Sequence, residues 1–324
     1  MASAMPSISS LRLIFPAAVL TAAVYAQPPQ GGRGGPQTEF MRQAQQAIRD
    51  GKLDDALAVY QKELAANPNS VAANNSAGTV LDLMGKGSEA RKYFQKAIDA
   101  APDAAGKAAA QRQMAMSYGF DGDCRNTIKY EEMVIAYHVT REKTEPQDAF
   151  YQEGEMANEA ARVCIDAGEL GLAETWYRKG TELGLKEPGN QTHPRSLWQF
   201  RLEHALARIA ARKGNKAEAQ KHVAAAKAAL DSDPKMAEQQ ARFFPYLTGY
   251  VALYTDDLKT AQTDLEKAAE ANGNDPFMQC LLGMTYEKLG MKEKSMEAYR
   301  KASTTTAHNP PAAFAKPFTR KKLN

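Results

Sequence analysis

Small, apolar and aromatic residues recur along most of this chain with a fixed period. From Gly51 the sequence reads GKLDDALAVYQKELAANP, and from Gly85 it reads GKGSEARKYFQKAIDAAP, so that matching positions lie 34 residues apart. The same separation returns near the other end of the chain, between Gly249 and Gly283. A period of this length predicts a stacked array of identical supersecondary units.

Each unit is predicted to be two antiparallel helices joined by a tight turn. Small residues such as Gly78 and Gly283 let the first helix approach its partner closely, and alanines do the same on the second helix. A glycine lies at the turn because it adopts backbone angles that other residues adopt reluctantly. Aromatic residues fill the gap toward the next hairpin, and Pro68 and Pro102 end the second helix. The repeat-signature positions are Gly51, Ala56, Tyr60, Pro68, Gly78, Gly85, Ala90, Phe94, Ala97, Pro102, Gly168, Ala173, Tyr177, Gly214, Ala219, Gly249, Ala261, Ala268, Gly283, Tyr286, Gly290, Tyr299 and Ala302.

This pattern resembles the tetratricopeptide repeat, which has a small residue and an aromatic on its first helix and alanine, an aromatic, alanine and proline on its second. The most specific copies span residues 78–102 and 282–302. With further turns near Gly122 and Asp256, we expect an all-α solenoid of about seven hairpins over residues 38–305. The resemblance implies a right-handed superhelix whose first helices line a concave groove for peptide ligands.

The middle copies depart from this pattern. Thr127 and Glu131 replace the alanine and the aromatic after Gly122, Val223 replaces an aromatic, and Leu265 does so after Asp256. The spacing between turns also stretches, which predicts longer helices or loops around residues 139–147, 186–195 and 231–244. These insertions either flank a binding site or only change the pitch of the superhelix.

Two stripes on adjacent first helices are candidates for the groove. A basic stripe and an aromatic stripe recur at helical spacing. Together they would hold an acidic or carboxylate-terminated peptide, because arginine offers planar bidentate donors and tyrosine offers rigid contact area. The alternatives are a solvated face for the basic stripe and inter-repeat core for the aromatic stripe. The candidate ligand-binding residues are Arg201, His204, Arg208, Arg212, Phe243, Tyr246, Tyr250 and Tyr254.

The N-terminal residues are predicted to direct export. Residues 1–26 combine Arg12 with an apolar run of about 12 residues and a small residue, Ala26, before the expected cleavage point, which is typical of a secretory signal peptide. A membrane anchor is the weaker alternative, because a spanning helix needs roughly 20 residues and Pro16 interrupts the run. Residues 27–37 form a Pro/Gly-rich flexible linker. We therefore expect a periplasmic or secreted protein.

The C-terminal residues 306–324 form a basic tail after the last predicted hairpin. Lys316, Arg320, Lys321 and Lys322 face no acidic residue in this segment. The tail would either contact anionic lipid headgroups or an acidic partner, or fold back through Phe314 and Phe318 to cap the last hairpin, and we favour the cap.

Composition changes this picture in two ways. The 41 basic and 38 acidic residues leave a net charge of only +3, which argues against nucleic acid as a partner. The three cysteines are an odd number, so at least one thiol stays unpaired within a monomer. Cys124 and Cys164 belong to neighbouring hairpins and could bridge, but we favour the interpretation that all three are small buried apolar residues.

The chain shows no catalytic motif. His-Glu-x-x-His, Gly-x-Ser-x-Gly and Cys-x-x-Cys patterns are absent, and the five histidines lack metal-ligand spacing. We therefore predict no enzyme activity, cofactor or metal, and a scaffold or adaptor in the bacterial cell envelope that binds a protein or peptide. The alternatives are a self-associating envelope structural protein, which would form homo-oligomers, and an accessory subunit of an envelope enzyme complex.

Overall fold

The computed structural model describes residues 38–189 and 192–324. The predicted signal peptide and the linker at residues 27–37 lie outside the described residues. Within the described ranges every regular element is helical. The expected all-α architecture is therefore confirmed.

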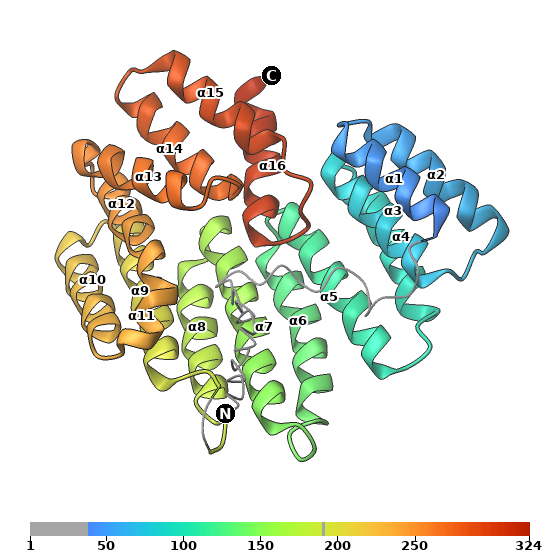
Figure 1. The fold of residues 1–324 in the computed structure, drawn as a ribbon, viewed down its shortest axis with the longest axis horizontal. Helices are drawn as coiled ribbons and strands as arrows, with labels where there is room; N and C mark the ends of the chain where they lie inside the picture. Colours follow the sequence, from blue (N-terminus) through green and yellow to red (C-terminus); the bar gives the residue numbers. More distant parts are fainter. Residues whose placement is uncertain (1–37, 190–191) are drawn as a thin grey trace, which may run out of the picture.

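Seven helical hairpins follow one another through the described chain, each formed by two consecutive helices that pack together. Figure 1 shows them side by side in chain order, curling from α1 to α15. This arrangement confirms the predicted solenoid of about seven hairpins. The pairs are α1 (Glu39–Arg49) with α2 (Leu53–Ala66), α3 (Val71–Met84) with α4 (Gly87–Asp99), α5 (Ala104–Phe120) with α6 (Cys124–Val139), α7 (Pro146–Ala167) with α8 (Leu170–Gly184), α9 (Arg195–Arg212) with α10 (Lys216–Asp231), α12 (Phe244–Tyr254) with α13 (Leu258–Ala271), and α14 (Pro276–Lys288) with α15 (Lys292–Ser303).

The turns inside the hairpins lie where the sequence predicts them. Gly85 has a φ of 81°, and the turn glycines of five other hairpins share this left-handed conformation. In the sixth hairpin Asp256 takes the same role with a φ of 60°, a conformation that aspartate tolerates better than most residues. The turn geometry is therefore conserved between hairpins even where the glycine is not.

Close helix packing within a hairpin depends on glycine opposite an aromatic ring. A Cβ atom on Gly78 would lie 2.7 Å from the ring of Phe94, and one on Gly283 would lie 2.4 Å from the ring of Tyr299. Phe94 also packs with Ala110 and Met114 of the following hairpin. The aromatic residue was predicted to fill the gap between its own hairpin and the next. It does so, and it also packs between the two helices of its own hairpin.

The three predicted insertions interrupt the array at the expected places. A loop precedes the 22-residue helix α7, and another separates α8 from α9. The third insertion holds the short helix α11 (Pro234–Gln240) and the 3-10 helix η1 (Ala241–Phe243). These additions lengthen the middle of the array and bring η1 next to α12.

The cysteines correct one expectation. Cys124 and Cys164 form a disulfide that joins the start of α6 to the end of α7, so they are not simply buried apolar residues. Only Cys280 remains a free buried thiol among the described residues. The bridge was not favoured from the sequence because only the fold brings the two Cα atoms within 4.8 Å.

The C-terminal segment forms a further helix, α16 (Pro310–Leu323). It packs on α14 and α15 of the last hairpin, and also on α5 and α7. Figure 1 shows α16 between the last hairpin and the helices near the start of the array. The segment therefore does more than cover one end, because it connects hairpins that are distant in sequence.

Candidate functional site

A pocket of about 100 Å3 lies where α7, α9, η1 and the start of α16 meet. Its walls combine aromatic and proline rings with three arginines and two glutamates. A cavity of this size accepts one side chain of a ligand. The lining residues are Glu155, Asn158, Glu159, Arg162, Tyr177, Phe200, Arg201, His204, Arg208, Phe243, Asn309, Pro310 and Pro311.

The basic stripe predicted on α9 is only partly in this pocket. Arg201, His204 and Arg208 line it, because they follow one another at helical spacing on one face of α9. Arg212 continues the stripe beyond the pocket and donates a hydrogen bond of 3.4 Å to the Tyr250 hydroxyl.

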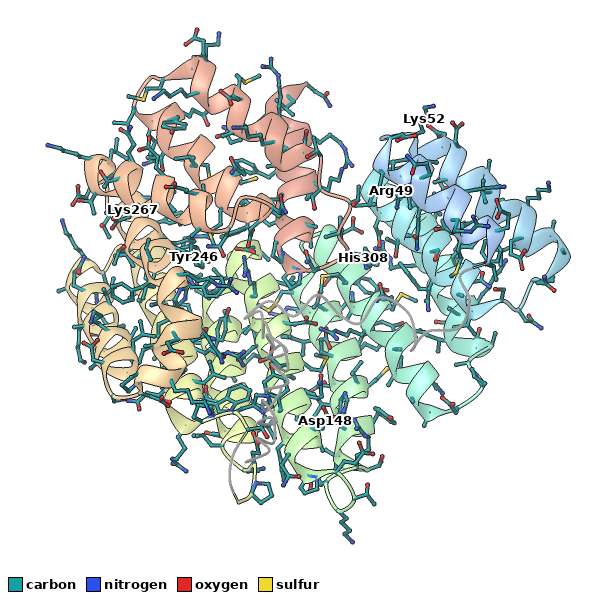
Figure 2. The ribbon with its side chains drawn as sticks, viewed as in Figure 1. Arg49, Lys52, Asp148, Tyr246, Lys267 and His308 are labelled. Carbon is teal, nitrogen blue, oxygen red and sulfur yellow. A yellow bond between two sulfur atoms is a disulfide. The ribbon has the colours of Figure 1, made fainter. Side chains whose placement is uncertain are left out.

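The aromatic stripe is mostly interior. Phe243 lines the pocket, whereas Tyr246 and Tyr250 are 0% exposed and pack in the core that α12 shares with α13 and α14. Tyr254 packs at the edge of the same core. Figure 2 shows Tyr246 among the side chains where α9 and α12 meet. Three of the four aromatic residues therefore support the pocket from behind, and any role of theirs in ligand binding stays a prediction.

Arg208 is held in place by two tyrosines. It is 3% exposed, and its guanidinium donates hydrogen bonds of 2.9 Å to the hydroxyls of Tyr246 and Tyr177. The accepting hydroxyls belong to α12 and α8, so two different helices that pack on α9 fix the arginine. Fixing a guanidinium in this way reduces the entropy that it would lose on binding an anion.

The remaining charges of the pocket form a ladder along α7. Arg201 of α9 forms an ion pair with Glu155, and Arg112 of α5 forms a bidentate pair with Glu159 whose Nε–O distance is 2.9 Å. Arg162 lies with its guanidinium 4.6 Å from the centre of the Phe277 ring. Both glutamates therefore have arginine partners, while Arg162 and Arg208 lie near the buried carboxyl of Asp166, and Arg162 also lies near that of Asp275.

Burial decides which of these groups are charged. It strongly lowers the pKa of His204, and the nearby Arg208 and Arg162 lower it further, so this histidine is neutral near pH 7. Burial also raises the pKa of Glu155, although Arg201 opposes that effect. The cationic groups that line the pocket are therefore its arginines and not the predicted histidine.

Two parts of the pocket were missed by the sequence analysis. The first is the polar face of α7, where Glu155, Glu159 and Arg162 recur at three to four residues and could have been recognised by that spacing. The second is the stretch from Asn309 to Pro311, which reaches the pocket only because α16 returns to the middle of the array. No local sequence pattern predicts that α16 packs against the middle of the array.

The pocket is suited to binding. Across residues 38–189 and 192–324, no group of three His, Cys, Asp or Glu side chains is placed to hold a metal ion. In the same part of the chain, no helix combines the length and the apolar character needed to cross a membrane. What the arrangement offers is a small apolar cavity with fixed guanidinium donors, which can hold an anionic group next to an apolar one.

Comparisons with known proteins agree with the repeat pattern. Family models described as tetratricopeptide repeat match residues 41–105 and 278–307. A comparison with curated proteins gives no match.

Similar solved structures include a tetratricopeptide repeat protein from Parabacteroides merdae ATCC 43184, with 17% identity and a TM-score of 0.42 over 82% of this chain and 91% of that chain. The apo form of RapI has 10% identity and a TM-score of 0.46 over 87% and 98%. The tetratricopeptide repeat domain of P58(IPK) has 14% identity and a TM-score of 0.31 over 88% and 88%.

The family models match the hairpins at both ends of the array, and the hairpins between them keep the same helix–turn–helix unit. Tetratricopeptide repeats therefore form the hairpins at both ends of this array.

Proposed function

We propose that this protein is an exported, non-catalytic adaptor that binds an acidic or carboxylate-terminated peptide in the pocket between α7 and α9. The repeats support the general part of this proposal, because tetratricopeptide repeats are scaffolds for protein interaction. The observation that carries the specific part is the fixed guanidinium of Arg208 beside an apolar cavity.

The pocket suits the end of a peptide chain. A terminal carboxylate accepts hydrogen bonds from guanidinium groups, and each such charge-assisted bond contributes about 1.5–3 kcal/mol. The side chain of the terminal residue would lie among Phe200, Phe243 and the two prolines. An acidic side chain next to an apolar one could make the same contacts, with its carboxylate on the guanidinium groups and the apolar side chain among the rings.

The disulfide supports export. Disulfides persist in oxidising compartments and are rare in the cytosol, so the bond between Cys124 and Cys164 agrees with the signal peptide predicted at residues 1–26. Export into a bacterial envelope remains part of the proposal.

The C-terminal cations do not support the lipid-binding alternative. Lys316 donates to the Ser303 carbonyl, Arg320 donates to the Leu83 carbonyl, and Lys322 pairs with Glu287. Contacts within the chain thus engage three of the four basic residues that were assigned to the tail. The proposed adaptor therefore binds protein and not a membrane surface.

The test is peptide binding by residues 27–324, measured against immobilised peptides that differ only in a free carboxylate or an amide at the C-terminus. We expect the carboxylate forms to bind and Arg208→Met to weaken binding at least tenfold. Arg212→Met is the matched control, because it removes an arginine one turn further along α9 that does not line the pocket.

Equal binding of carboxylate and amide forms, or full binding by Arg208→Met, would overturn the proposal. Circular dichroism of both variants distinguishes lost binding from lost folding. Size-exclusion chromatography with light scattering, run at several concentrations, tests the alternative of self-association, which predicts a mass that grows with concentration.

A further inference from the structure

One face of α16 is attached to the last hairpin through aromatic rings. The ring centres of Phe314 and Phe277 are 4.8 Å apart, and those of Phe318 and Tyr299 are 5.5 Å apart. The Lys316 ammonium donates to the Ser303 carbonyl at 2.7 Å. Large rings bury much more area than smaller side chains, so this contact holds α16 to α14 and α15 firmly.

The opposite face of α16, with the residues just before it, meets α3 and α5. His308 places its ring nitrogens 2.8 Å from Asp82 Oδ2 and 2.8 Å from Gln113 Oε1. Ala312 and Ala313 pack in a small core with residues of α3 and α5, and Arg320 donates to the Leu83 carbonyl. We name this contact of His308, Ala312, Ala313 and Arg320 the closing seam. Figure 2 shows His308 at the junction between α16 and α5.

The closing seam and the aromatic face hold α16 by different contacts. On the α16 helix itself the closing seam buries two alanine methyl groups and adds one hydrogen bond of 3.2 Å from Arg320, whereas the opposite face packs two partly buried phenylalanine rings on the last hairpin. Before the helix, His308 anchors the seam, because the centre of its ring also lies 5.6 Å from that of Phe94 and 5.1 Å from that of Phe120. If α16 loosens, its helical part should separate from α5 while the aromatic contact with the last hairpin persists.

The closing seam lies directly next to the pocket. Asn309, Pro310 and Pro311 follow His308 in the chain and form one wall of the pocket, while α7 and α9 form the opposite wall. The first two helical positions of α16 are prolines, which makes this wall stiff. A movement of α16 away from α5 would therefore move the wall as one piece and widen the pocket.

We infer that α16 is an intramolecular gate, which remains on the last hairpin while the closing seam with α3 and α5, together with the contact between α16 and α7, opens to admit a peptide to the pocket. The link to peptide entry rests on the proposed function. The opening itself can be tested without any ligand.

The first test measures thiol accessibility on the two faces of α16. Ala313→Cys reports on the closing seam, and the native Cys280 reports on the opposite contact, because it packs with Ala315, Phe314 and Phe318. The probe is N-ethylmaleimide, with the modified site read by mass spectrometry. The two remaining cysteines are joined in the disulfide and do not react.

We expect Arg320→Ala to raise the rate of modification at Cys introduced by Ala313→Cys at least threefold and to leave Cys280 unchanged. Lys321→Ala is the matched control, because Lys321 is exposed on the same turn of α16. Equal acceleration of both thiols would overturn the gate, since α16 would then leave as a whole. No acceleration at either thiol would also overturn it.

The second test locks the closing seam. A Cβ atom on Gly119 would lie 3.6 Å from Cβ of Ala313, which is within the range that a disulfide requires. The variant Gly119→Cys/Ala313→Cys should therefore crosslink α5 to α16 when oxidised. Gly119→Cys alone is the control for the tight contact of the new side chain with Val163 and for any effect of reductant on the native disulfide.

With the tightest carboxylate-terminated peptide from the binding experiment as probe, we expect the oxidised lock to slow association at least tenfold and reduction to restore it. An unchanged association rate in the locked protein would overturn the link between gate and pocket. If no peptide bound the unaltered protein, the proposed function would fail, but the maleimide rates would still decide whether the closing seam opens.

Discussion

The hairpins at the ends of the array and those in its middle bury different chemistry. In α3–α4 and α14–α15, an aromatic ring rests on a glycine of the partner helix. In α7–α8 and α9–α10, the interior holds arginines that have glutamate or tyrosine hydroxyl partners. The family models match at both ends, and neither match includes these middle hairpins.

This difference between end and middle hairpins indicates that the same repeat serves two roles, stacking of the array and formation of a pocket. The repeat signature consists of small and aromatic residues that allow any hairpin to stack on its neighbour. Where the signature is complete, aromatic rings fill the space between helices, and the buried polar groups are uncharged or acidic, such as Asn74 and Asp82 in α3. In the middle hairpins arginine side chains also enter the interior, and there the pocket is found.

The largest expected effect is on stability, and it comes from truncating the side chain at the aromatic position of the repeat in an end hairpin and in a middle hairpin. Phe94→Ala should lower the free energy of unfolding by about 4 kcal/mol, because the ring is 0% exposed and fills the space over Gly78. Val223→Ala, at the corresponding position of the fifth hairpin, should cost about 2 kcal/mol for two buried methyl groups. Urea unfolding followed by circular dichroism measures both, and equal losses would break the comparison.

The next effect concerns how the middle is held together. Cys124→Ala/Cys164→Ala removes the bond that closes a 40-residue separation, and we expect the free energy of unfolding to fall by about 4 kcal/mol. Hydrogen exchange should increase mainly in α6 and α7, since these helices are the ones joined. Cys280→Ala is the control for the loss of a buried cysteine, and a uniform increase along the array would show that the bond does not act locally.

The smallest effect is a pH dependence in the middle of the array. Burial, together with the charge of Glu142, raises the pKa of Glu153 on α7 to about 7. Between the ordinary pKa of about 4.5 and this value, the folded state binds more protons than the unfolded state, so Glu153 makes stability fall as pH rises.

Glu153→Gln should remove this contribution. The stability of the variant should therefore increase relative to that of the unaltered protein as pH rises from 5 to about 7. The difference between the two melting-temperature curves isolates this residue from other titrating groups. Parallel curves would show that Glu153 does not titrate in that window. Glu145→Gln, which changes a largely exposed glutamate, should leave the curve unchanged.

The array was predictable from the sequence because its information is local. The position of Gly85 and its distance to Ala90 and Phe94 specify a turn, a close helix contact and a filled gap within one hairpin. Even the replacement of the turn glycine by Asp256 left the period visible. Contacts between neighbouring repeats therefore follow from short stretches of sequence.

The pocket was only partly predictable because its walls come from distant segments. The spacing of Arg201 and Arg208 placed both on one face of a helix, and they do share the pocket. Burial of Tyr246 and Tyr250 could not be inferred, since an aromatic stripe has the same spacing in a groove as in a core. Likewise, the sequence around Pro310 contains no pattern that predicts the approach of this residue to α9.

The closing seam also has a consequence for the order in which the chain folds. Most contacts of a repeat array join neighbours, and such contacts form quickly because little chain must be brought together. The contact between His308 and Asp82 instead joins residues that are 226 positions apart. Closing a loop of that length costs more entropy than forming a hairpin, and α16, which supplies one side of it, follows all seven hairpins in the chain. We therefore expect the array to assemble as an open spiral and to become a closed one only when α16 docks.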